Sequence, residues 1–386
     1  MTRPAAAVFA RWSWSVAVVG LGLAATASRA VDEGGVADGA RPTTQASAAR
    51  EAVLATQPAW LRPDPFPAGS AAARAATRPS PNLKPAARPA SRPVEAITHV
   101  LVVSIDGLRP DLLLLADAPN ARKLMARGVY SMWAQTTPQS ITLPSHLSML
   151  TGVTPNRHGI LWNSDLPLEY PLFPNVPTLF EAAKRHGYTT AVAAGKDKFD
   201  AFDRPGVLDW RWIPSKGAVK TGAVVGPACD IIKQHKPNAM LVHFPSVDAT
   251  GHGNGWGSPE QMKAITEADA ALGRLVDAME EAGTADSTLM IISADHGGAM
   301  KGHGPEDPRS RHIPWIAVGP GLRKGYDLSL NVKTLVKTED TFATACWALG
   351  IPPTVTNLDG TPVKAIVAPR AGEELMQPST KPAKEW

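Results

Sequence analysis

The chain has 386 residues, which suffices for one large α/β domain or for two domains of average size. Hydrophobic residues make up 44% of it, so a sizeable core can form, whereas 36 prolines and 32 glycines indicate long irregular stretches. The net charge of +4 comes with no basic stripe, which argues against a dedicated nucleic-acid-binding protein. Two cysteines, Cys229 and Cys346, exclude a disulfide framework but leave one bridge between them open.

The first 30 residues have the layout of a secretory signal peptide. Arg3 and Arg11 come early, an apolar run extends from Trp12 to Ala25, and small residues follow around Ala27 and Ala30. The run is shorter than the roughly 20 residues of a membrane span, although an uncleaved segment would tether the protein to a membrane. We therefore predict an exported protein, either periplasmic or secreted.

Residues 31–97 are rich in Ala, Pro, Arg and Ser and contain few aliphatic side chains. Such a composition buries too little apolar surface to offset the entropy of ordering, so we predict a disordered linker. From residue 98 to 353 apolar runs alternate with helical periodicity, and we assign this region to a single catalytic domain. Residues 354–386 are predicted to be a C-terminal tail.

The elements of this domain follow one another in an alternating order. The patterns predict strands over 98–106, 188–195, 238–248, 287–297 and 313–321, and helices over 118–128, 176–187, 222–237, 258–283 and 338–350. A further helix is expected to begin near Leu143 or Pro144. Because the strands are apolar on both faces and separated by helices, we predict a three-layer α/β/α sandwich around a mainly parallel sheet.

Three carboxylates stand at the ends of predicted strands. Asp106, Asp248 and Asp295 each close an apolar run, and the carboxyl ends of parallel strands meet at one edge of a sheet. Like charges brought together in this way repel one another unless a cation neutralises them. Any one of these residues alone would be an ordinary cap or turn residue, but the three together predict a metal site.

Histidines accompany these carboxylates at short spacing. His252 follows Asp248 by four residues, and His296 and His303 follow Asp295. Mixed carboxylate and imidazole ligands suit Zn²⁺ best, with Mn²⁺ or Fe as substitutes. We predict a centre for two divalent metal ions.

Thr142 stands in the segment "TLPSH", at the expected start of a helix. A hydroxyl is a poor nucleophile unless a metal or a base activates it, and a helix N-terminus favours a phosphate. Two metals on opposite sides of a phosphorus atom can stabilise both the attacking and the leaving oxygen. Thr142 is therefore the candidate nucleophile.

Several motifs together resemble a known family. The segments "VVSIDGLRPD", "TLPSHLSMLTGVTPNRHGI", "PSVDATGHGNG" and "SADHGG" with a following "HG" are similar to the alkaline phosphatase superfamily, and within it to the type I phosphodiesterase/nucleotide pyrophosphatase branch. The resemblance covers about residues 98–353 and implies an alkaline phosphatase-like fold. It also implies a phosphothreonine intermediate on Thr142, with the Asn163 side chain as a donor to the phosphoryl oxygen. The ligands implied for one metal are Asp106, Thr142, Asp295 and His296, and those for the other are Asp248, His252 and His303.

The sequence departs from two neighbouring patterns. Sulfatases of the superfamily carry a Cys or Ser that is oxidised to formylglycine, and Thr142 cannot become that aldehyde. Nucleotide pyrophosphatases of this branch typically place an aromatic residue directly after the nucleophile, where this chain has Leu143. Preference for nucleotides is therefore left open. His146 is expected to be structural or to make a supporting hydrogen bond.

The segment "GKDKF" resembles the lysine pair with which phosphonoacetate hydrolases hold a substrate carboxylate. On that resemblance Lys196 and Lys198 are candidates for binding an anionic leaving group, and the alternative is a solvated loop. Among the other histidines, His158 is expected to shape the loop before Asn163. His312 competes with His303 for the last ligand position, and motif order favours His303.

The combined prediction is an exported, bimetal phosphodiesterase/nucleotide pyrophosphatase-like hydrolase that acts on a small phosphate ester through a phosphothreonine intermediate. Two alternatives stay open. The same site could serve a phosphonate or phosphate monoester, or the scaffold could belong to a catalytically inactive binding protein. Neither the oligomeric state nor pairing of the two cysteines follows from the sequence.

Overall fold

The computed structural model describes residues 91–163, 173–305, 307–331, 334–352 and 357–368. The predicted signal peptide and nearly all of the predicted linker lie outside these described residues. Among the helices that the structure does describe, none is long and apolar enough to span a bilayer.

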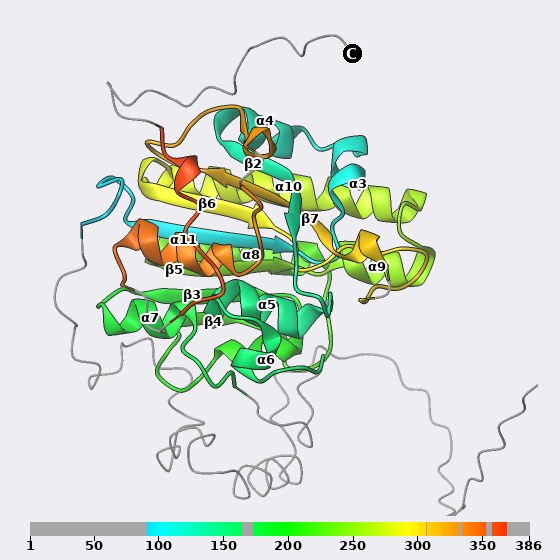
Figure 1. Cartoon of the computed structure of the whole chain (residues 1–386), viewed down its shortest axis with the longest axis horizontal. Helices are drawn as coiled ribbons and strands as arrows, with labels where there is room; N and C mark the ends of the chain where they lie inside the picture. The colour runs from blue at the N-terminus through cyan, green and yellow to red at the C-terminus, as the bar shows by residue number, and fades with distance from the viewer. Residues whose placement is uncertain (1–90, 164–172, 306, 332–333, 353–356, 369–386) are drawn as a thin grey trace, which may run out of the picture. The chain divides into compact units, whose positions relative to one another are not determined.

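An eight-stranded sheet forms the centre of the fold, in the order β4-β3-β5-β1-β6-β7-β2-β8 (Figure 1). Strand β7 runs antiparallel to its neighbours β6 and β2, and the other pairs are parallel. The strands are β1 (His99–Ile105), β2 (Val129–Gln135), β3 (Thr190–Ala194), β4 (Trp210–Trp212), β5 (Ala239–Phe244), β6 (Thr288–Ser293), β7 (His312–Val318) and β8 (Tyr326–Asp327).

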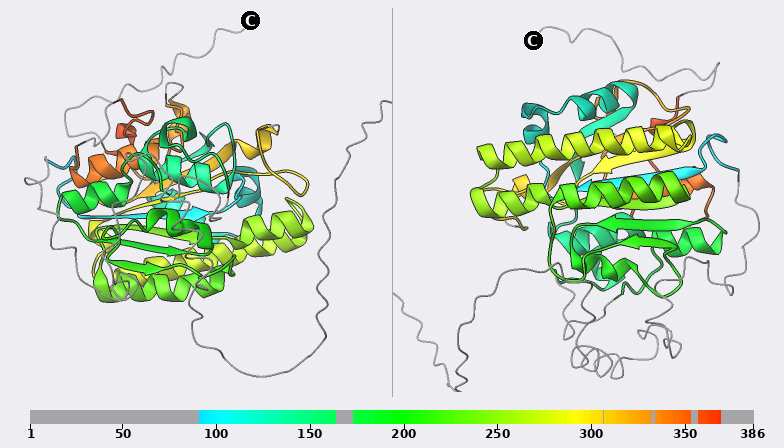
Figure 2. Two further views of the ribbon diagram at one scale, coloured as in Figure 1. Left: turned by 90° about the horizontal axis from the view of Figure 1, so that it is seen from below. Right: turned by 180° about the vertical axis from the view of Figure 1, so that it is seen from behind.

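Helices cover both faces of this sheet, which confirms the predicted three-layer arrangement. One face carries α5 (Thr142–Thr151), α6 (Pro155–His158), α7 (Leu179–Arg185) and α11 (Asp340–Leu349) (Figure 1). The other face carries α4 (Pro119–Arg127), α8 (Thr221–His235) and α10 (Pro259–Glu281), as the view from behind shows (Figure 2). Helices α3 (Pro110–Leu115) and α9 (Ser246–Asn254) follow β1 and β5, and short 3₁₀ helices lie at Asp197–Phe202, Ala285–Ser287, Pro308–Ser310, Leu328–Leu330 and Lys364–Ile366.

The three central strands are buried on both faces. Every residue of β5 and β6 is buried, and so is every residue of β1 after His99. Strand β1 lies between the other two, with Ser104 in register with His243 and Ser293. The carboxyl ends of β5, β1 and β6 therefore lie side by side, where loops after the strands can build a site.

Two predicted boundaries need correction. The strand predicted over 238–248 ends at Phe244, and Asp248 lies in the first turn of helix α9. Pro245 is the cause, because proline has no N–H for a strand ladder and its backbone here is already helical. The helix expected to begin near Leu143 or Pro144 begins at Thr142, which is therefore its first residue.

The packed body extends beyond both predicted limits of the catalytic domain. Ile97, Val363 and Ile366 are buried in the core. Asp359, in the predicted tail, accepts a hydrogen bond of 2.7 Å from the backbone N–H of Thr154. Residues 357–368 thus pack against the domain and are not a separate tail. The rest of the predicted tail lies outside the described residues.

Candidate metal centre and nucleophile

Three strands bring the predicted carboxylates together at one edge of the sheet. Asp106 directly follows β1, Asp295 follows β6, and Asp248 comes from α9 after β5. Gly107 has a φ of +73°, and a Cβ at this position would lie only 2.9 Å from the Asp248 Cα atom. The glycine therefore lets helix α9 approach β1 closely enough to place Asp248 beside Asp106.

The predicted ligands form two overlapping groups. Asp106, Asp295 and His296 form one, and Asp248, His296 and His303 form the other, with the ligand atoms of each group within 4.8 Å of one another. His252 joins the second group, since its Nε2 atom lies 3.4 Å from Asp248 Oδ1. The six carboxylate and imidazole ligands predicted from the sequence thus lie in one cluster.

His312 is placed elsewhere, against the ring of Trp133 at 4.0 Å between centroids. His303 has its Nε2 atom 3.7 Å from Asp248 Oδ1. The distance to Asp248 therefore favours His303 over His312 as a ligand.

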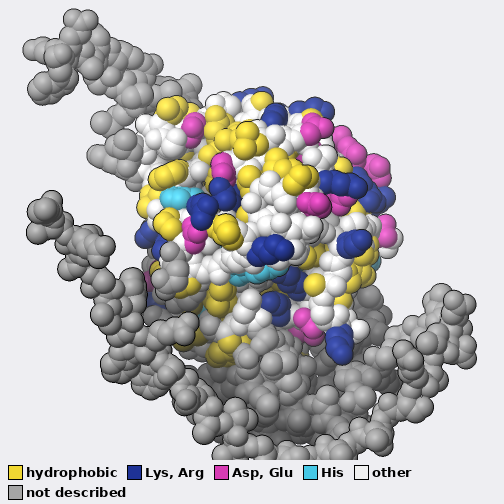
Figure 3. All heavy atoms as spheres, turned by 90° about the vertical axis from the view of Figure 1, so that its right-hand side faces the viewer, with side chains coloured by type: hydrophobic (Ala, Val, Ile, Leu, Met, Phe, Trp, Pro, Cys, Tyr) yellow, Lys and Arg dark blue, Asp and Glu magenta, His cyan; other side chains and the backbone are white. Residues whose placement is uncertain are grey.

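Figure 3 looks onto the side of the molecule where α3 and α9 lie. Histidine side chains reach the surface on this side, with lysine and arginine side chains next to them.

Backbone carbonyls fix the tautomer of the three clustered histidines. The Nδ1 atoms of His252, His296 and His303 lie 3.0, 2.8 and 2.8 Å from the carbonyl oxygens of Lys301, Gly297 and Ser140, respectively. A carbonyl oxygen only accepts, so each Nδ1 carries the hydrogen, and Nε2 keeps a lone pair when the ring is neutral. Burial lowers the pKa of His296 to about 4 and also lowers the pKa of His303, which keeps both rings neutral at pH 7.

The carboxylates present lone pairs to these same nitrogens. His296 Nε2 lies 3.4 Å from Asp106 Oδ1 and 3.2 Å from Asp295 Oδ2. Asp106 Oδ1, Asp248 Oδ1 and Asp295 Oδ2 are buried and have no hydrogen-bond partner among the described residues. Burial, with Asp106 next in importance, raises the pKa of Asp295 well above its ordinary value. A cation between such facing lone pairs would stabilise them, so these carboxylate and imidazole ligands fit divalent metal ions.

Thr142 lies beside this cluster. It is buried at the first position of helix α5, and its Oγ1 atom is 3.4 Å from His296 Nε2. The next backbone N–H, that of Leu143, donates to Asn163 Oδ1 at 2.9 Å. Helix α5 thus presents the hydroxyl and its positive end to the metal ligands. Asn163 contacts the residue that directly follows the candidate nucleophile.

The two lysines lie in the site but contact protein groups. Lys196 Nζ is 2.7 Å from Asp106 Oδ2 and 2.7 Å from Asp248 Oδ2. Lys198 Nζ donates to the backbone oxygen and to the Oδ1 atom of Asn163, at 2.8 and 3.1 Å. Burial alone would raise the pKa of Asp106, but Lys196 and His243 outweigh it and hold that pKa well below its ordinary value. The two lysines therefore do not lie on a solvated loop, which was the alternative prediction.

His243 was not predicted as a site residue, and for His146 only a structural or supporting role was predicted. His243 Nε2 donates to Asp106 Oδ2 at 2.8 Å, because its Nδ1 atom accepts the N–H of Gly195. His146 Nδ1 donates to the carbonyl oxygen of Thr142 at 2.8 Å and lies 3.3 Å from Asp295 Oδ2. The signal in the sequence was the position of His243 within the apolar run of β5, because a polar side chain buried there needs a hydrogen-bond partner.

His158 lies in the core beside helix α5. Its Nε2 atom is 3.1 Å from the carbonyl oxygen of Pro144, and its Nδ1 atom accepts the N–H of Ile160 at 3.2 Å. Burial lowers the pKa of His158 to about 4, so the ring is neutral. These contacts join the loop that leads to Asn163 to the helix of Thr142.

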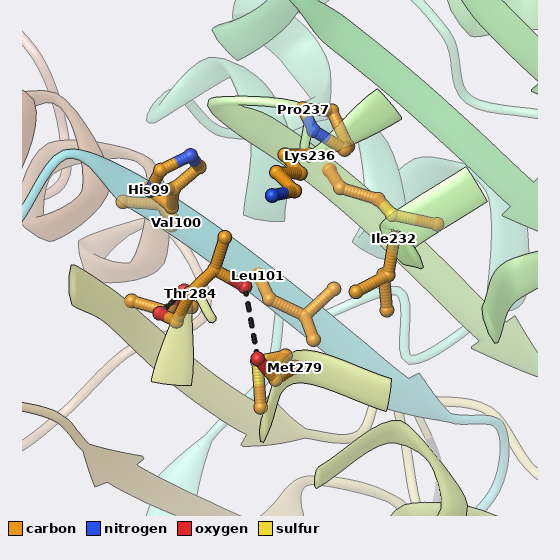
Figure 4. Close-up of a pocket in the computed structure, with 10 residues that line it drawn as sticks. His99, Val100, Leu101, Ile232, Lys236, Pro237, Met279 and Thr284 are labelled. Atoms are coloured by element: carbon orange, nitrogen blue, oxygen red, sulfur yellow. Dashed lines mark hydrogen bonds between the residues drawn. The ribbon is translucent and has the colours of Figure 1, made fainter. Parts of the chain in front are cut away.

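A small cavity of about 20 Å³ lies at the opposite edge of the sheet (Figure 4). His99 at the start of β1 and Thr288 at the start of β6 line it, together with Lys236 and Met279. It has room for about one water molecule and lies away from the metal ligands, so it takes no part in the site.

Comparisons with known proteins identify the family of the chain. The family described as type I phosphodiesterase / nucleotide pyrophosphatase matches residues 100–301, which is more than half of the chain. An uncharacterized pyrophosphatase/phosphodiesterase of Schizosaccharomyces pombe is 28% identical over 215 residues, covering 51% of this chain and 44% of the relative. A venom phosphodiesterase of Macrovipera lebetinus is 26% identical over 51% of this chain and 25% of its own length. The chain thus spans less than half the length of these relatives.

Solved structures share the fold at low sequence identity. Murine ectonucleotide pyrophosphatase/phosphodiesterase 5 superposes with a TM-score of 0.57 at 17% identity, covering 67% of this chain and 97% of that chain. The phosphonate monoester hydrolase of Agrobacterium radiobacter gives a TM-score of 0.53 at 18% identity, covering 69% of this chain and 76% of that one. On the family match and the shared fold, this chain belongs to the type I phosphodiesterase/nucleotide pyrophosphatase family.

Proposed function

We propose that the chain is a metal-dependent phosphodiesterase that hydrolyses small phosphate esters through a phosphothreonine intermediate on Thr142. The observation that carries this proposal is the set of three buried carboxylate oxygens without hydrogen-bond partners, which faces imidazole lone pairs and lies beside a buried threonine hydroxyl. One metal would be held by Asp106, Thr142, Asp295 and His296, and the other by Asp248, His252 and His303. Zinc suits this donor set best.

Two divalent cations would lower the pKa of the Thr142 hydroxyl and offset the charge that develops on the phosphoryl oxygens. The Thr142 hydroxyl would then attack phosphorus, and the bond from phosphorus to the leaving oxygen would break. One alcohol would be released, and the proton of the hydroxyl would pass to it through solvent. Water would next attack the phosphothreonine, which restores the threonine and releases a phosphate monoester. His146, which donates to the Thr142 carbonyl, would hold the first turn of helix α5 in place during both steps.

Asn163 would donate a hydrogen bond to a phosphoryl oxygen. The Leu143 N–H and the Lys198 ammonium both use its Oδ1 atom, which leaves the Nδ2 group as the donor. A neutral donor adds electrostatic stabilisation without adding a further charge.

The family supports a diester as substrate. An inactive threonine-to-alanine variant of murine ectonucleotide pyrophosphatase/phosphodiesterase 5 is known in complex with AMP, which supports an essential threonine in that relative. Leu143 in place of an aromatic residue leaves nucleotide preference open. Lys196 and Lys198, predicted to bind an anionic leaving group, contact protein groups instead.

We also propose that the protein is exported, because its N-terminal 30 residues have the layout of a signal peptide. The relatives include a venom phosphodiesterase, and that name fits a secreted enzyme. Comparing the N-terminus of the mature protein with residue 31 would test cleavage.

Metal analysis combined with turnover tests the proposed function. Purified protein should hold about two zinc equivalents and hydrolyse bis-p-nitrophenyl phosphate. A chelator should abolish this activity, and added zinc should restore it. Protein that holds no metal and has no turnover after zinc addition would instead indicate an inactive binding protein.

A further inference from the structure

Lys196 joins the two halves of the proposed metal centre. It follows strand β3, and its ammonium lies 2.7 Å from an oxygen of Asp106 and 2.7 Å from an oxygen of Asp248. These two carboxylates are the ligands proposed for different metals. Asp106 and Asp248 are almost fully buried, so their charges have little water to stabilise them.

The two oxygens of each carboxylate face different sides of the cluster. The Oδ2 atoms of Asp106 and Asp248 both contact Lys196, and Asp106 Oδ2 also accepts a hydrogen bond from His243. The Oδ1 atoms point to imidazoles instead, with 3.4 Å from Asp106 Oδ1 to His296 Nε2 and 3.4 Å from Asp248 Oδ1 to His252 Nε2. The lysine therefore does not lie between the carboxylates and the imidazoles of His252 and His296, and it can stay in place while metals bind on the side of these two histidines.

We propose that Lys196 is a resident cation of the metal centre, which keeps the metal-free carboxylates together and weakens the binding of divalent cations by charge repulsion. This inference rests on the proposed function, and it replaces the role in binding an anionic leaving group that the sequence suggested. A lysine whose ammonium contacts two protein carboxylates has little capacity left for a substrate anion. Its charge, by contrast, acts on any cation that Asp106 and Asp248 bind.

The physical consequence differs between the metal-free and the metal-loaded protein. Without metals, removal of the ammonium leaves the buried Asp106 and Asp248 carboxylates without the cation that contacts them both, which is strongly destabilising. With metals bound, the dications neutralise the same carboxylates, so removal of the ammonium costs less folding stability. Stability and binding are linked, and a variant that loses more stability in the metal-free state must therefore bind metal more tightly.

The test compares Lys196→Met with Lys196→Arg and with the matched control Lys184→Met. Lys184 is also buried and pairs with one carboxylate, Asp209, at 2.7 Å. Asp209 in turn accepts the N–H of Thr190 at the start of β3, so this pair lies at the other edge of the sheet. The melting temperature is measured in metal-free and zinc-saturated protein, and zinc retention is measured against increasing chelator.

Lys196→Met should lower the melting temperature by at least about 5 °C more in the metal-free protein than in the zinc-saturated protein. It should also hold zinc at a chelator concentration at least about tenfold higher than the wild type does. Lys184→Met should lower both melting temperatures equally and leave zinc retention unchanged. Lys196→Arg keeps the charge and should stay within about twofold of wild-type zinc retention.

Two results would overturn the inference. One is that Lys196→Met lowers the melting temperature equally in the metal-free and the zinc-saturated protein, as the control does. The other is release of zinc at a lower chelator concentration, which would make Lys196 an orienting clamp. The metal-free measurement is independent of the proposed function, which fails separately if the wild type binds no zinc. If Lys196→Met folds poorly, adding Asp248→Asn removes one negative charge and should raise the metal-free melting temperature, whereas a further fall would also contradict the proposed role.

Discussion

Asn163 accepts the backbone N–H of Leu143 at 2.9 Å and so connects a loop to the first turn of helix α5, beside Thr142. Lys198 donates to the same amide oxygen at 3.1 Å. The side chain is therefore oriented from two directions, with its oxygen toward the protein. This orientation makes the Nδ2 group available to a phosphoryl oxygen.

Replacing Asn163 should affect catalysis without affecting metal content. Asn163→Ala removes both the donor and the contact with Leu143, and Asn163→Asp keeps an acceptor for Leu143 but has no donor at neutral pH. We expect both variants to lower kcat/KM for bis-p-nitrophenyl phosphate by about 10²–10³-fold, as for other donors to developing negative charge. Zinc content should equal that of the wild type. An Ala variant within about threefold of wild-type kcat/KM would exclude Asn163 as a donor.

The choice between His303 and His312 can be settled by metal retention. His303→Ala should weaken the site that it shares with Asp248 and His252 by about tenfold or more, because one of three protein ligands is lost. His312→Ala removes a ring that stacks on Trp133 and should leave zinc affinity unchanged. Chelator competition on both variants provides the measurement, and the reverse pattern would reassign the ligand.

A pH-dependent contribution to stability is expected from Asp359. Burial raises its pKa, but hydrogen bonds from Thr154 and Arg157 outweigh this effect and leave the pKa below the ordinary value of 3.8. A lowered pKa means that the stabilisation is fully present above pH 4 and is lost as the pH falls through the folded-state value. Asp359→Asn should therefore reduce the free energy of unfolding by about 1 kcal/mol at pH 7.

Below pH 3 the difference between Asp359→Asn and wild type should shrink, and urea unfolding at both pH values measures it. A difference that does not change with pH would mean that the carboxylate charge contributes nothing. Because Asp359 lies in the predicted tail, the same experiment tests whether residues beyond 353 belong to the folded domain.

The substrate preference follows from the charges in the site. A diester carries one negative charge, whereas a monoester dianion is better met by an additional cation near the nucleophile. Lys196 is already bound to two carboxylates, and Arg157 pairs with Asp359 at 2.8 Å. We expect kcat/KM for bis-p-nitrophenyl phosphate to exceed that for p-nitrophenyl phosphate. A strong monoester preference that disappears in Lys196→Ala would mean that the lysine binds the phosphate itself.

Much of the fold could be predicted because its central strands are unbroken apolar runs. Strands β1, β3, β5 and β6 and the long helix α10 follow directly from such patterns, with Ser258 as the N-cap of α10. Strand β2 was missed because only some of its residues are buried and Trp133 is exposed, which breaks the apolar run. Its place next to the antiparallel β7 depends on contacts distant in sequence.

For the site, the sequence predicted which residues gather but not how they are supported. Asp248 and His252 share a helix face because they are four residues apart, although the sequence suggested that Asp248 ended a strand. The contacts of Lys196 with two carboxylates, and that of His243 with Asp106, join separate strands. Spacing along the chain holds no information on such contacts.

The turnover of Thr142→Ala bears most directly on the covalent route. With bis-p-nitrophenyl phosphate and saturating zinc, this variant should lose at least about a thousandfold in kcat while its fold stays intact, because the attacking oxygen is gone. Thr142→Ser keeps a hydroxyl at the first position of helix α5 and should retain measurable turnover. Near wild-type turnover by Thr142→Ala would contradict a phosphothreonine intermediate.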